Sequence, residues 1–385
     1  MAHNTLEDNR PAAIRRQAGY LPAIEATLAD FLARQVELMQ GLDPAVGAFA
    51  RIARDLVLSG GKRMRPTFAY WGWRGFAGPH EPVEPLLPAL AALELMHTFA
   101  LMHDDVMDRS TMRRGVPTAH QIFAGRHAAI VGRGDSERFG TTSAILAGDL
   151  CLVWADQLLA CARIPAATLF DVRSCYDSMR IEAVAGQYLD VLSETMPESW
   201  SIERALLVAR NKTASYTVRR PLQFGLALAG AERAAASPIE AVQIKAVQIE
   251  AAYGRYGVAI GEAFQLRDDL LGTFGDPRVT GKPADDDVRS GKPTTLLMLA
   301  LQLATPAQRA ELVRDTVGDP AGLDHQAGAG RLAEIIAQTG APARVEELIR
   351  ERVASGLTAL DDAPIDPDAR AALTDLAVAA ANRPT

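Results

Sequence analysis

The hydrophobic pattern along the chain predicts helices nearly everywhere. Apolar residues recur three and four positions apart over long segments, which is the period of an amphipathic helix. One helix is predicted to begin near Pro85 to Pro88, because proline suits a first helical turn, and to run through Leu90, Leu93 and Met96 into a group of aspartates. Further helices are predicted over residues 21–39, 45–58, 65–76, 143–161, 168–191, 201–214, 215–229, 238–271, 293–303, 306–316, 330–339, 342–361 and 367–382.

Stretches rich in glycine, proline or charge separate these helices. They cover residues 40–44, 77–85, 131–140, 193–200, 272–292 and 317–329. None has the composition of a domain linker, and we find no convincing strand or hairpin signal. The sequence therefore predicts an all-α protein with a single domain over residues 17–385. Residues 1–16 are polar and charged, which predicts a disordered tail.

Composition narrows the class of protein. Of the 385 residues 48% are hydrophobic, which is enough for a large core. The net charge of −7 argues against nucleic-acid binding, since nucleic-acid binders usually carry a basic surplus. The N-terminus lacks the apolar core of a signal peptide, and no uncharged apolar run reaches the length of a membrane span. Three cysteines without metal-ligand spacing, together with these absences, predict a cytoplasmic location.

A cluster of three aspartates followed by two arginines is the first strong chemical signal. It contains Asp104, Asp105 and Asp108, and Arg113 and Arg114 follow. Like charges raise one another's pKa, so crowded carboxylates need compensation. Mg²⁺ prefers oxygen ligands and commonly joins one or two carboxylates to a substrate phosphate, while arginine binds the remaining phosphate oxygens. Asp104 and Asp108 share a helix face, which makes them the natural joint ligands. Solvated acids at a helix C-terminus are the alternative, which the helix dipole disfavours.

A second acid pair ends another apolar helix. Asp268 and Asp269 are followed, four positions on, by Gly272 where the first cluster has a further acid. On its own the pair is weak evidence for a site, because surface acids before a loop are common. Lys282 and Lys292 follow in glycine-containing segments, which favours a second phosphate-binding region. Neither lysine fits a Walker A loop, because the glycine required five positions before the Gly-Lys pair is absent.

A third basic segment has no acids beside it. Gly60 and Gly61 precede Lys62, Arg63 and Arg65. Backbone N–H groups can approach a phosphate closely where glycines lack side chains, so this segment is a candidate metal-free anion site. A solvated basic loop at a helix start is the alternative.

These residues together resemble the trans-prenyltransferases, the isoprenyl diphosphate synthases. The resemblance extends from about residue 55 to 300 and rests on motifs in the family's order: Gly60-Gly61-Lys62-Arg63-Met64-Arg65-Pro66, His97 with Asp104 to Asp108 and Arg113-Arg114-Gly115, Leu146-Ala147-Gly148-Asp149, Lys212-Thr213, and Phe264-Gln265 with Asp268-Asp269 and Lys282. It implies an isoprenoid-synthase-type helical bundle around a deep central cavity, and a homodimer. It also implies a reaction in which isopentenyl diphosphate condenses with an allylic diphosphate of five to fifteen carbons.

The resemblance also implies roles for particular residues. Several Mg²⁺ ions are expected on Asp104, Asp108 and Asp268, with Asp105 and Asp269 in support. The allylic diphosphate is expected on Arg113, Lys212 and Lys282. Isopentenyl diphosphate is expected on Lys62, Arg65, His97 and Arg114. The expected catalytic set is Lys212, Thr213 and Gln265, of which Thr213 and Gln265 face the developing carbocation.

The chemistry explains why these residue types are needed. Diphosphate leaves when its negative charge is neutralised, which Mg²⁺, Arg and Lys do electrostatically. The double bond of isopentenyl diphosphate then captures the allylic cation, so no side-chain nucleophile is required. Gly272 departs from the family's second motif, which carries an acid there, but the first aspartate of that motif is retained as Asp268. For His103 we favour a hydrogen-bonding or core role.

Product length is expected to depend on two residues before the first aspartate motif. In this family the fourth and fifth positions before the motif line the cavity floor, and here they are Ala100 and Phe99. Phe99 lies about 7.5 Å along the helix from Asp104. One aromatic at the fifth position resembles the pattern of geranylgeranyl (C20) diphosphate synthases, whereas two aromatics would indicate farnesyl (C15). Plain core packing is the alternative role of Phe99.

Two other functions compete with this interpretation. A class I terpene cyclase also uses an aspartate-rich motif, but it would lack the Lys62 and Arg65 site for a second diphosphate. A non-catalytic regulatory subunit of a prenyl synthase is expected to have lost acids of the first motif, and this chain has kept all three. Only Gly272 favours the subunit.

Overall fold

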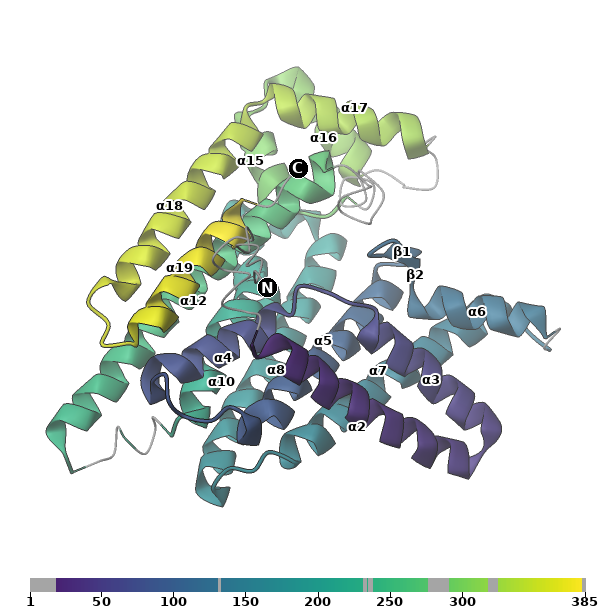
Figure 1. Ribbon diagram of the computed structural model, residues 1–385. Coiled ribbons are helices and arrows are strands. Elements are labelled where there is room, and N and C mark those ends of the chain that lie inside the picture. The colour runs from purple at the N-terminus through teal and green to yellow at the C-terminus, as the bar shows by residue number, and fades with distance from the viewer. Residues whose placement is uncertain are drawn as a thin grey trace, which may run out of the picture.

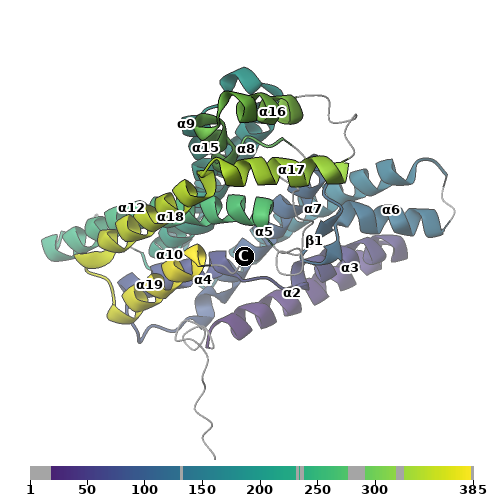
Figure 2. The ribbon, with the colours of Figure 1, turned by 90° about the horizontal axis from the view of Figure 1, so that it is seen from above.

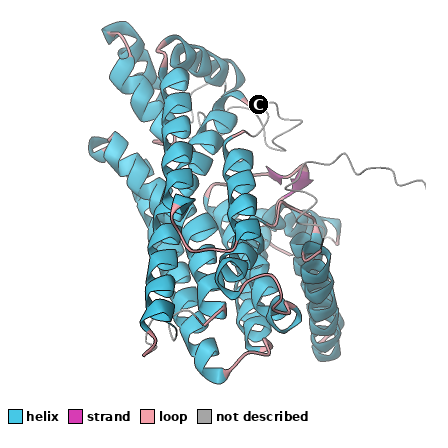
Figure 3. Cartoon of the chain, turned by 60° about the vertical axis from the view of Figure 1, so that its left-hand side comes forward, coloured by secondary structure: helices cyan, strands magenta, loops and turns pink. Residues whose placement is uncertain are grey.

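The structure is a computed structural model that describes residues 19–130, 133–230, 234, 238–275, 291–317 and 325–382. These residues are almost entirely helical, as Figures 1 and 3 show. The predicted all-α class is therefore confirmed. Residues 1–16 lie outside the described part of the chain, so the tail stays a prediction.

The helices span nearly all of the described residues. In chain order they are α2 (Leu21–Leu42), α3 (Pro44–Leu58), α4 (Met64–Ala77), η1 (Glu84–Leu86), α5 (Leu87–Met107), α6 (Ala119–Ala129), α7 (Ser136–Ala160), α8 (Ala166–Thr195), η2 (Pro197–Ser199), α9 (Ile202–Val208), η3 (Ala209–Arg219), α10 (Arg220–Leu228), α12 (Glu240–Phe274), α15 (Thr295–Leu303), α16 (Pro306–Val317), α17 (His325–Gln338), α18 (Ala341–Asp361) and α19 (Pro367–Ala381).

A small β-ribbon was not predicted. β1 (Met112–Arg113) pairs with β2 (Val116–Pro117) in antiparallel register, and Figure 3 shows the pair in magenta. Arg114 and Gly115 between them have φ angles of 54° and 77°. Two positive φ values in a two-residue loop are the conformation of a type I′ hairpin turn, which glycine favours. Strands of two residues are too short to show an alternating pattern, so this ribbon has no strand signal in the sequence.

Several helix boundaries also differ from the prediction. Helix α6 was missed, and α7 begins inside the predicted break 131–140 because Asp135 caps its first turn by accepting a hydrogen bond from the Glu137 N–H at 2.9 Å. Helices α8 and α17 likewise extend into predicted breaks. The predicted boundary between residues 214 and 215 is absent, since α9, η3 and α10 follow without interruption.

Helix η3 has π-helical geometry, which is rare over a length of 11 residues. Glycines on the neighbouring helices allow it to fit. A Cβ on Gly261 of α12 would overlap Ala214, and a Cβ on Gly186 of α8 would overlap the backbone at Lys212. The backbones of α8 and α12 therefore approach η3 from two sides and hold Lys212 in place.

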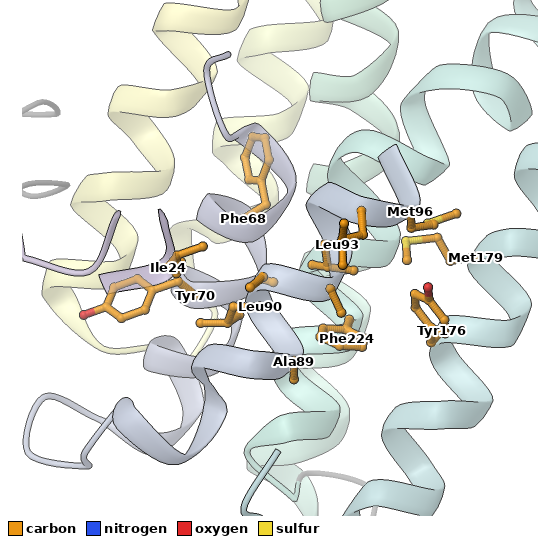
Figure 4. Close-up of a cluster of buried hydrophobic side chains, with 14 of the residues drawn as sticks. Ile24, Phe68, Tyr70, Ala89, Leu90, Leu93, Met96, Tyr176, Met179 and Phe224 are labelled. Atoms are coloured by element: carbon orange, nitrogen blue, oxygen red, sulfur yellow. The ribbon is translucent and has the colours of Figure 1, made fainter. Parts of the chain in front are cut away.

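Helix α5 is the centre of the main core. Its Leu90, Leu93 and Met96 are fully buried and belong to the same cluster as Tyr176 of α8 and Phe224 of α10 (Figure 4). Each such side chain contributes about 1.5–3 kcal/mol of hydrophobic stabilisation when fully buried. Burial around its N-terminal half fixes the position of the aspartates at the C-terminal end of α5.

A second core cluster lies among α15, α16, α17 and the adjoining parts of α12 and α18. Helix α12 contributes Ile260 to the main cluster and Leu266 to the second, while α18 contributes Leu360 and Ile349 respectively. The two helices lie side by side through both clusters (Figures 1 and 2). This continuity is the reason that we retain the prediction of a single domain.

Two helical stretches of the described residues, Glu84–Met107 and Ser136–Ala160, are long and apolar enough to cross a membrane by length and composition. Their most apolar windows are 61% and 50% buried inside the molecule. A core helix passes the same test, so the two stretches are weak evidence for a membrane span. The expected absence of such a span stays a prediction.

Candidate active site

A large central cavity of about 1420 Å³ lies between the helices. It is bordered by residues of α5, α8, α9, η3 and α12, by the segment before α4, and by residues 292–295. Among the candidate site residues that the structure describes, all border this cavity except Asp105. Lys282 lies outside the described residues, so its expected role stays a prediction. The deep cavity expected for the fold is thus present, and the motifs converge on it.

Arg113 forms hydrogen bonds with both of the first two aspartates. Its Nε donates to Asp105 Oδ1 at 2.7 Å, and its Nη2 donates to Asp104 Oδ2 at 3.1 Å. The β-ribbon places Arg113 there by turning the chain back after α5. Asp105 is only 4% exposed, so its structural role is to orient Arg113, while Asp104 borders the cavity.

Two lysines lie among the carboxylates. Lys212 Nζ lies 3.0 Å from Asp104 Oδ1 and 2.6 Å from Asp190 Oδ2. Lys292 Nζ lies 2.9 Å from Asp190 Oδ2 and 3.7 Å from Asp108 Oδ2. Asp190 on α8 therefore joins two lysines that come from separate parts of the chain. Alternating acid and ammonium groups balance the charge of this buried region.

Burial and neighbouring charges shift the pKa values of the aspartates in different directions. Burial acts to raise the pKa of Asp104, but Lys212, Lys292 and Arg113 hold that pKa well below its usual range. Asp190 is affected in the same way, because Lys292 and Lys212 lower its pKa against the effect of burial. Asp108 has a raised pKa, since burial and the charges of Asp104 and Asp190 outweigh Lys292. Asp104 and Asp190 are thus strongly held as anions.

Asp268 and Asp269, the second acid pair, have different roles in the structure. Asp269 is 3% exposed, accepts a hydrogen bond from Gln265 Nε2 at 2.8 Å, and accepts the Thr295 N–H at 3.1 Å. It therefore fixes the Gln265 side chain and the start of α15. Asp268 borders the cavity one position earlier, and so does Gly272. Only one turn of helix separates them, so Gly272 widens the cavity where an acid was expected.

The basic end of the cavity is built on the two glycines. Gly60 and Gly61 have φ angles of 97° and 139°, which favour glycine. Arg114 Nη1 donates to the Gly60 carbonyl, and a Cβ on Gly61 would lie 2.7 Å from that Nη1. The absence of a side chain at Gly61 therefore gives Arg114 its position. Lys62 follows directly and is exposed on the cavity wall.

A network behind this basic end holds His97 and Arg65. Buried Arg63 pairs with Glu94 at 2.8 Å and so ties the loop to α5. The Tyr216 hydroxyl lies 2.9 Å from His97 Nδ1, and the Arg65 guanidinium carbon lies 3.9 Å from the centre of the Tyr216 ring. Burial, followed by the charges of Arg65 and nearby arginines, lowers the pKa of His97 well below its usual range, so the imidazole is neutral.

The predicted floor residues are also brought together. Phe99 and Ala100 both border the cavity, and the Phe99 ring meets His103 edge to face with centres 4.8 Å apart. His103 Nε2 lies 2.9 Å from the Ile145 carbonyl oxygen, which can only accept, so Nε2 donates. A Cβ on Gly148 would overlap the His103 ring. The Leu-Ala-Gly-Asp motif thus makes room for the histidine that supports Phe99.

Sequence reasoning missed Asp190, although the chain carried a signal for it. Buried positions of α8 include Val172, Tyr176, Met179 and Gly186, spaced three, four or seven apart. Asp190 continues that spacing, so an acid falls on the apolar face of the helix. Buried acids are rare unless paired, which should have marked it as a site residue. Lys292 was predicted only as part of a phosphate-binding region, and its carboxylate partners come from the tertiary structure.

The carboxylates fit Mg²⁺ only together with a substrate. In the described part of the chain, no three His, Cys, Asp or Glu side chains are grouped closely enough to hold a metal ion. Mg²⁺ usually takes one or two carboxylates and completes its shell with waters and substrate phosphates. Asp104, Asp108 and Asp268 offer hard oxygen donors at the cavity wall, which suits that mode of binding.

Comparison with known proteins decides the family. The polyprenyl synthetase family model matches residues 47–323. The chain belongs to the polyprenyl synthetase family. As the motifs predicted, this polyprenyl synthetase is a trans-prenyltransferase, that is, a trans-isoprenyl diphosphate synthase.

Relatives of this polyprenyl synthetase make different products. It is 33% identical to a geranylfarnesyl diphosphate synthase of Aeropyrum pernix over 74% of this chain and 78% of that protein. It is 31% identical to a (2E,6E)-farnesyl diphosphate synthase of Mycobacterium bovis over 74% and 70%. A solved geranylgeranyl pyrophosphate synthase of Corynebacterium glutamicum, complexed with isoprenyl diphosphate and magnesium, has a TM-score of 0.85 at 39% identity, covering 94% of this chain and 98% of that one.

Proposed function

We propose that this synthase condenses isopentenyl diphosphate with an allylic diphosphate of five to fifteen carbons and that geranylgeranyl diphosphate is its main product. The observation that carries the proposal is the presence of two anion-binding regions on one cavity. One contains acids with Arg113, Lys212 and Lys292, and the other contains Lys62 and Arg114 without a bordering aspartate. Two diphosphates of different metal dependence can therefore face each other across an apolar space.

The cation-rich region of the acid cluster suits the allylic diphosphate. Arg113, Lys212 and Lys292 supply donors that neutralise the leaving diphosphate. Mg²⁺, when bound by Asp104, Asp108 and Asp268, would supply further positive charge to the same oxygens. Asp190 positions the two lysines, and Asp105 positions Arg113. These residues thus stabilise the charge that develops as the carbon–oxygen bond breaks.

The basic end suits isopentenyl diphosphate. Lys62, Arg65 and Arg114 provide positive charge, and neutral His97 offers a hydrogen bond without adding charge. Thr213 and Gln265 border the cavity, and we propose that their oxygens stabilise the allylic cation. Gln265 is held for this task by Asp269. The released diphosphate is the base that we propose for the final proton.

The proposal of a C20 product depends on Phe99 and Ala100, the residues expected to line the cavity floor. Phe99 presents a ring to the cavity and Ala100 leaves space beside it. The relatives include synthases named for farnesyl, geranylgeranyl and geranylfarnesyl products, so family membership alone does not select a length. The edge-to-face support from His103 holds the Phe99 ring in place, which favours a fixed limit to chain growth.

A homodimer is part of the proposal. Several large apolar side chains on α7 and α8 are exposed: Leu146 at 55%, Val153 at 54%, Phe170 at 75% and Ile181 at 69%. Large exposed apolar patches mark interaction sites, and we propose that these side chains form one. Sedimentation analysis at micromolar concentration is expected to give twice the mass of the 41.3 kDa chain, and Ile181→Glu is expected to yield monomers. A monomeric parent protein would contradict this part.

The reaction is tested with purified protein, Mg²⁺, isopentenyl diphosphate and C5, C10 or C15 allylic diphosphates. Mass spectrometry of the products is expected to show mainly C20. The variant Asp104→Asn/Asp108→Asn is the matched control and is expected to be inactive while keeping its helical circular dichroism. No elongation with any primer would remove the proposed activity and favour a non-catalytic subunit. A cyclic hydrocarbon from one diphosphate would favour a terpene cyclase.

A further inference from the structure

A second concave site lies among η3, α12 and α18, apart from the active site. We refer to it as the arginine groove, and its lining includes Arg210, Gly254, Arg255, Glu262, Arg352 and Ser355. It measures about 780 Å³ and shares no lining residue with the central cavity. Its walls are η3, α12 and α18, of which α12 and α18 run side by side in Figures 1 and 2.

A buried carboxylate organises this groove. Glu262 is 2% exposed, and its two oxygens meet different arginines. Oε1 pairs with Arg210 Nε, and Oε2 lies 2.6 Å from Arg352 Nε. One arginine would be enough to neutralise this acid. The second arginine therefore gives the cluster of Glu262, Arg210 and Arg352 a net positive charge inside the groove.

The third arginine increases that excess. Arg255 is exposed on the groove wall, one helical turn from Ala259. Three arginines against one glutamate give a formal charge of +2 within the groove. Concave surfaces lined by one sign of charge concentrate the field and raise the local concentration of counter-ions. The charge therefore favours an anionic ligand.

The arginines are oriented as well as charged. Arg210 donates its Nε–H to Glu262, whereas Arg352 Nε lies 2.6 Å from the same carboxylate as an ion pair without a hydrogen bond. Within the described residues, the terminal nitrogens of both arginines make no further hydrogen bond or ion pair. A guanidinium fixed at one edge presents its other donors in a set direction, which matches the paired oxygens of a phosphate. Arg210 is 48% and Arg352 31% exposed, so these donors are accessible.

Small residues keep the groove open. Gly254 has no atom within 4 Å of where a Cβ would stand, so it leaves open space beside Arg255. On α18, a Cβ at Gly356 would lie 2.6 Å from Ile260 Cδ1, so this glycine allows α18 to approach α12 closely. The groove is thus a shallow space bounded by backbone, with donors from three helices.

We infer that the arginine groove binds a phosphate or diphosphate group outside the active site. Arg210 lies two residues before Lys212 on η3, and Glu262 lies three residues before Gln265 on α12. An anion there would join the three helices that carry and support those residues. The inference does not depend on the proposed prenyl transfer, because it rests on the groove alone.

Calorimetric titration of the intact protein with inorganic diphosphate, in low salt and without divalent cations, tests this inference. The active site also offers cations, so the wild-type protein is expected to show two components. Arg255→Glu reverses an exposed charge in the groove, and Ser355→Asp places a carboxylate among the arginines without removing any of them. Each variant is expected to weaken the groove component of diphosphate binding at least about tenfold and to leave the active-site component unchanged.

Arg350→Glu is the matched control, since it makes the same charge change at an exposed position of α18 that does not line the groove. It is expected to keep both components. Unchanged binding in both groove variants would overturn the inference, as would equal loss in the control. A parallel titration with geranyl diphosphate distinguishes the sources: similar affinity indicates recognition of the free anion, and affinity more than tenfold tighter indicates a prenylated ligand. No turnover is measured, so failure of the proposed activity would not affect the result.

Discussion

The Lys212 ammonium lies 2.6 Å from the buried carboxylate of Asp190, although 22 residues and a change of helix separate them. Asp190 also binds Lys292, which comes from beyond the second aspartate motif. One acid that the sequence motifs did not contain therefore positions two of the cations proposed to bind the allylic diphosphate.

Replacing Asp190 by asparagine keeps the shape of the side chain but removes the charge that holds both lysines. We expect kcat to fall about 10- to 100-fold, as is typical when a partner of catalytic groups is lost. Asp177→Asn on the same helix is the control, since its carboxylate pairs with arginines at the surface. Steady-state kinetics with a saturating allylic primer measures the difference. Equal rates for the two variants would show that Asp190 has no positioning role.

Gly61→Ala is expected to displace Arg114, because the new Cβ would lie 2.7 Å from its Nη1. The predicted result is a KM for isopentenyl diphosphate raised at least about tenfold, with a smaller change for the allylic substrate. Gly60→Ala provides the comparison: its φ is also positive, yet no atom lies within 4 Å of the added methyl group. If both variants change KM equally, backbone strain rather than contact with Arg114 is responsible.

Phe99→Ala is expected to lengthen the product, because it removes the ring that borders the cavity at its proposed floor. Mass spectrometry of the prenyl diphosphates should shift from C20 to C25 or longer. Phe49→Ala, which removes a ring that packs on Phe123 away from the cavity, should leave the distribution unchanged. An unaltered distribution in Phe99→Ala would exclude this residue as the floor.

Glu182 is expected to make stability depend on acid pH. Burial acts to raise its pKa, but hydrogen bonds from Arg220 and Ser215 and the charge of Arg219 lower that pKa to about 2 from an ordinary 4.5. A folded pKa below the unfolded value stabilises the protein above about pH 4.5, and this stabilisation is lost as the pH falls toward 2.

Glu182→Gln should therefore reduce the free energy of unfolding at pH 7 by up to about 2 kcal/mol, allowing for partial exposure, and should flatten its decline between pH 5 and 3. Urea unfolding at several pH values measures both effects. Glu198→Gln, at an exposed position, is the control. Parallel pH curves for the Glu182 variant and the parent protein would refute the linkage.

The local pattern predicted most helices because their apolar spacing is a property of neighbouring residues. It failed where the deciding feature was very short or non-local. The hairpin at Arg114 and Gly115 has strands of two residues, and the continuous run from α9 to α10 contains a π-helix that depends on glycines of α8 and α12. Helix α6 was not recognised from its own pattern.

The sequence by itself determined the helical fold, the family and the spacing that puts Asp104 and Asp108 on one face, because these depend on periodicity and ordered motifs. It also marked the segments that border the cavity. Only the tertiary structure decided which partners these acids bind. Asp105 and Asp269 turn to Arg113 and Gln265, while Asp190 joins Lys212 and Lys292. The physical reason is that buried charges need partners within hydrogen-bonding distance, and those partners come from helices far apart in the chain.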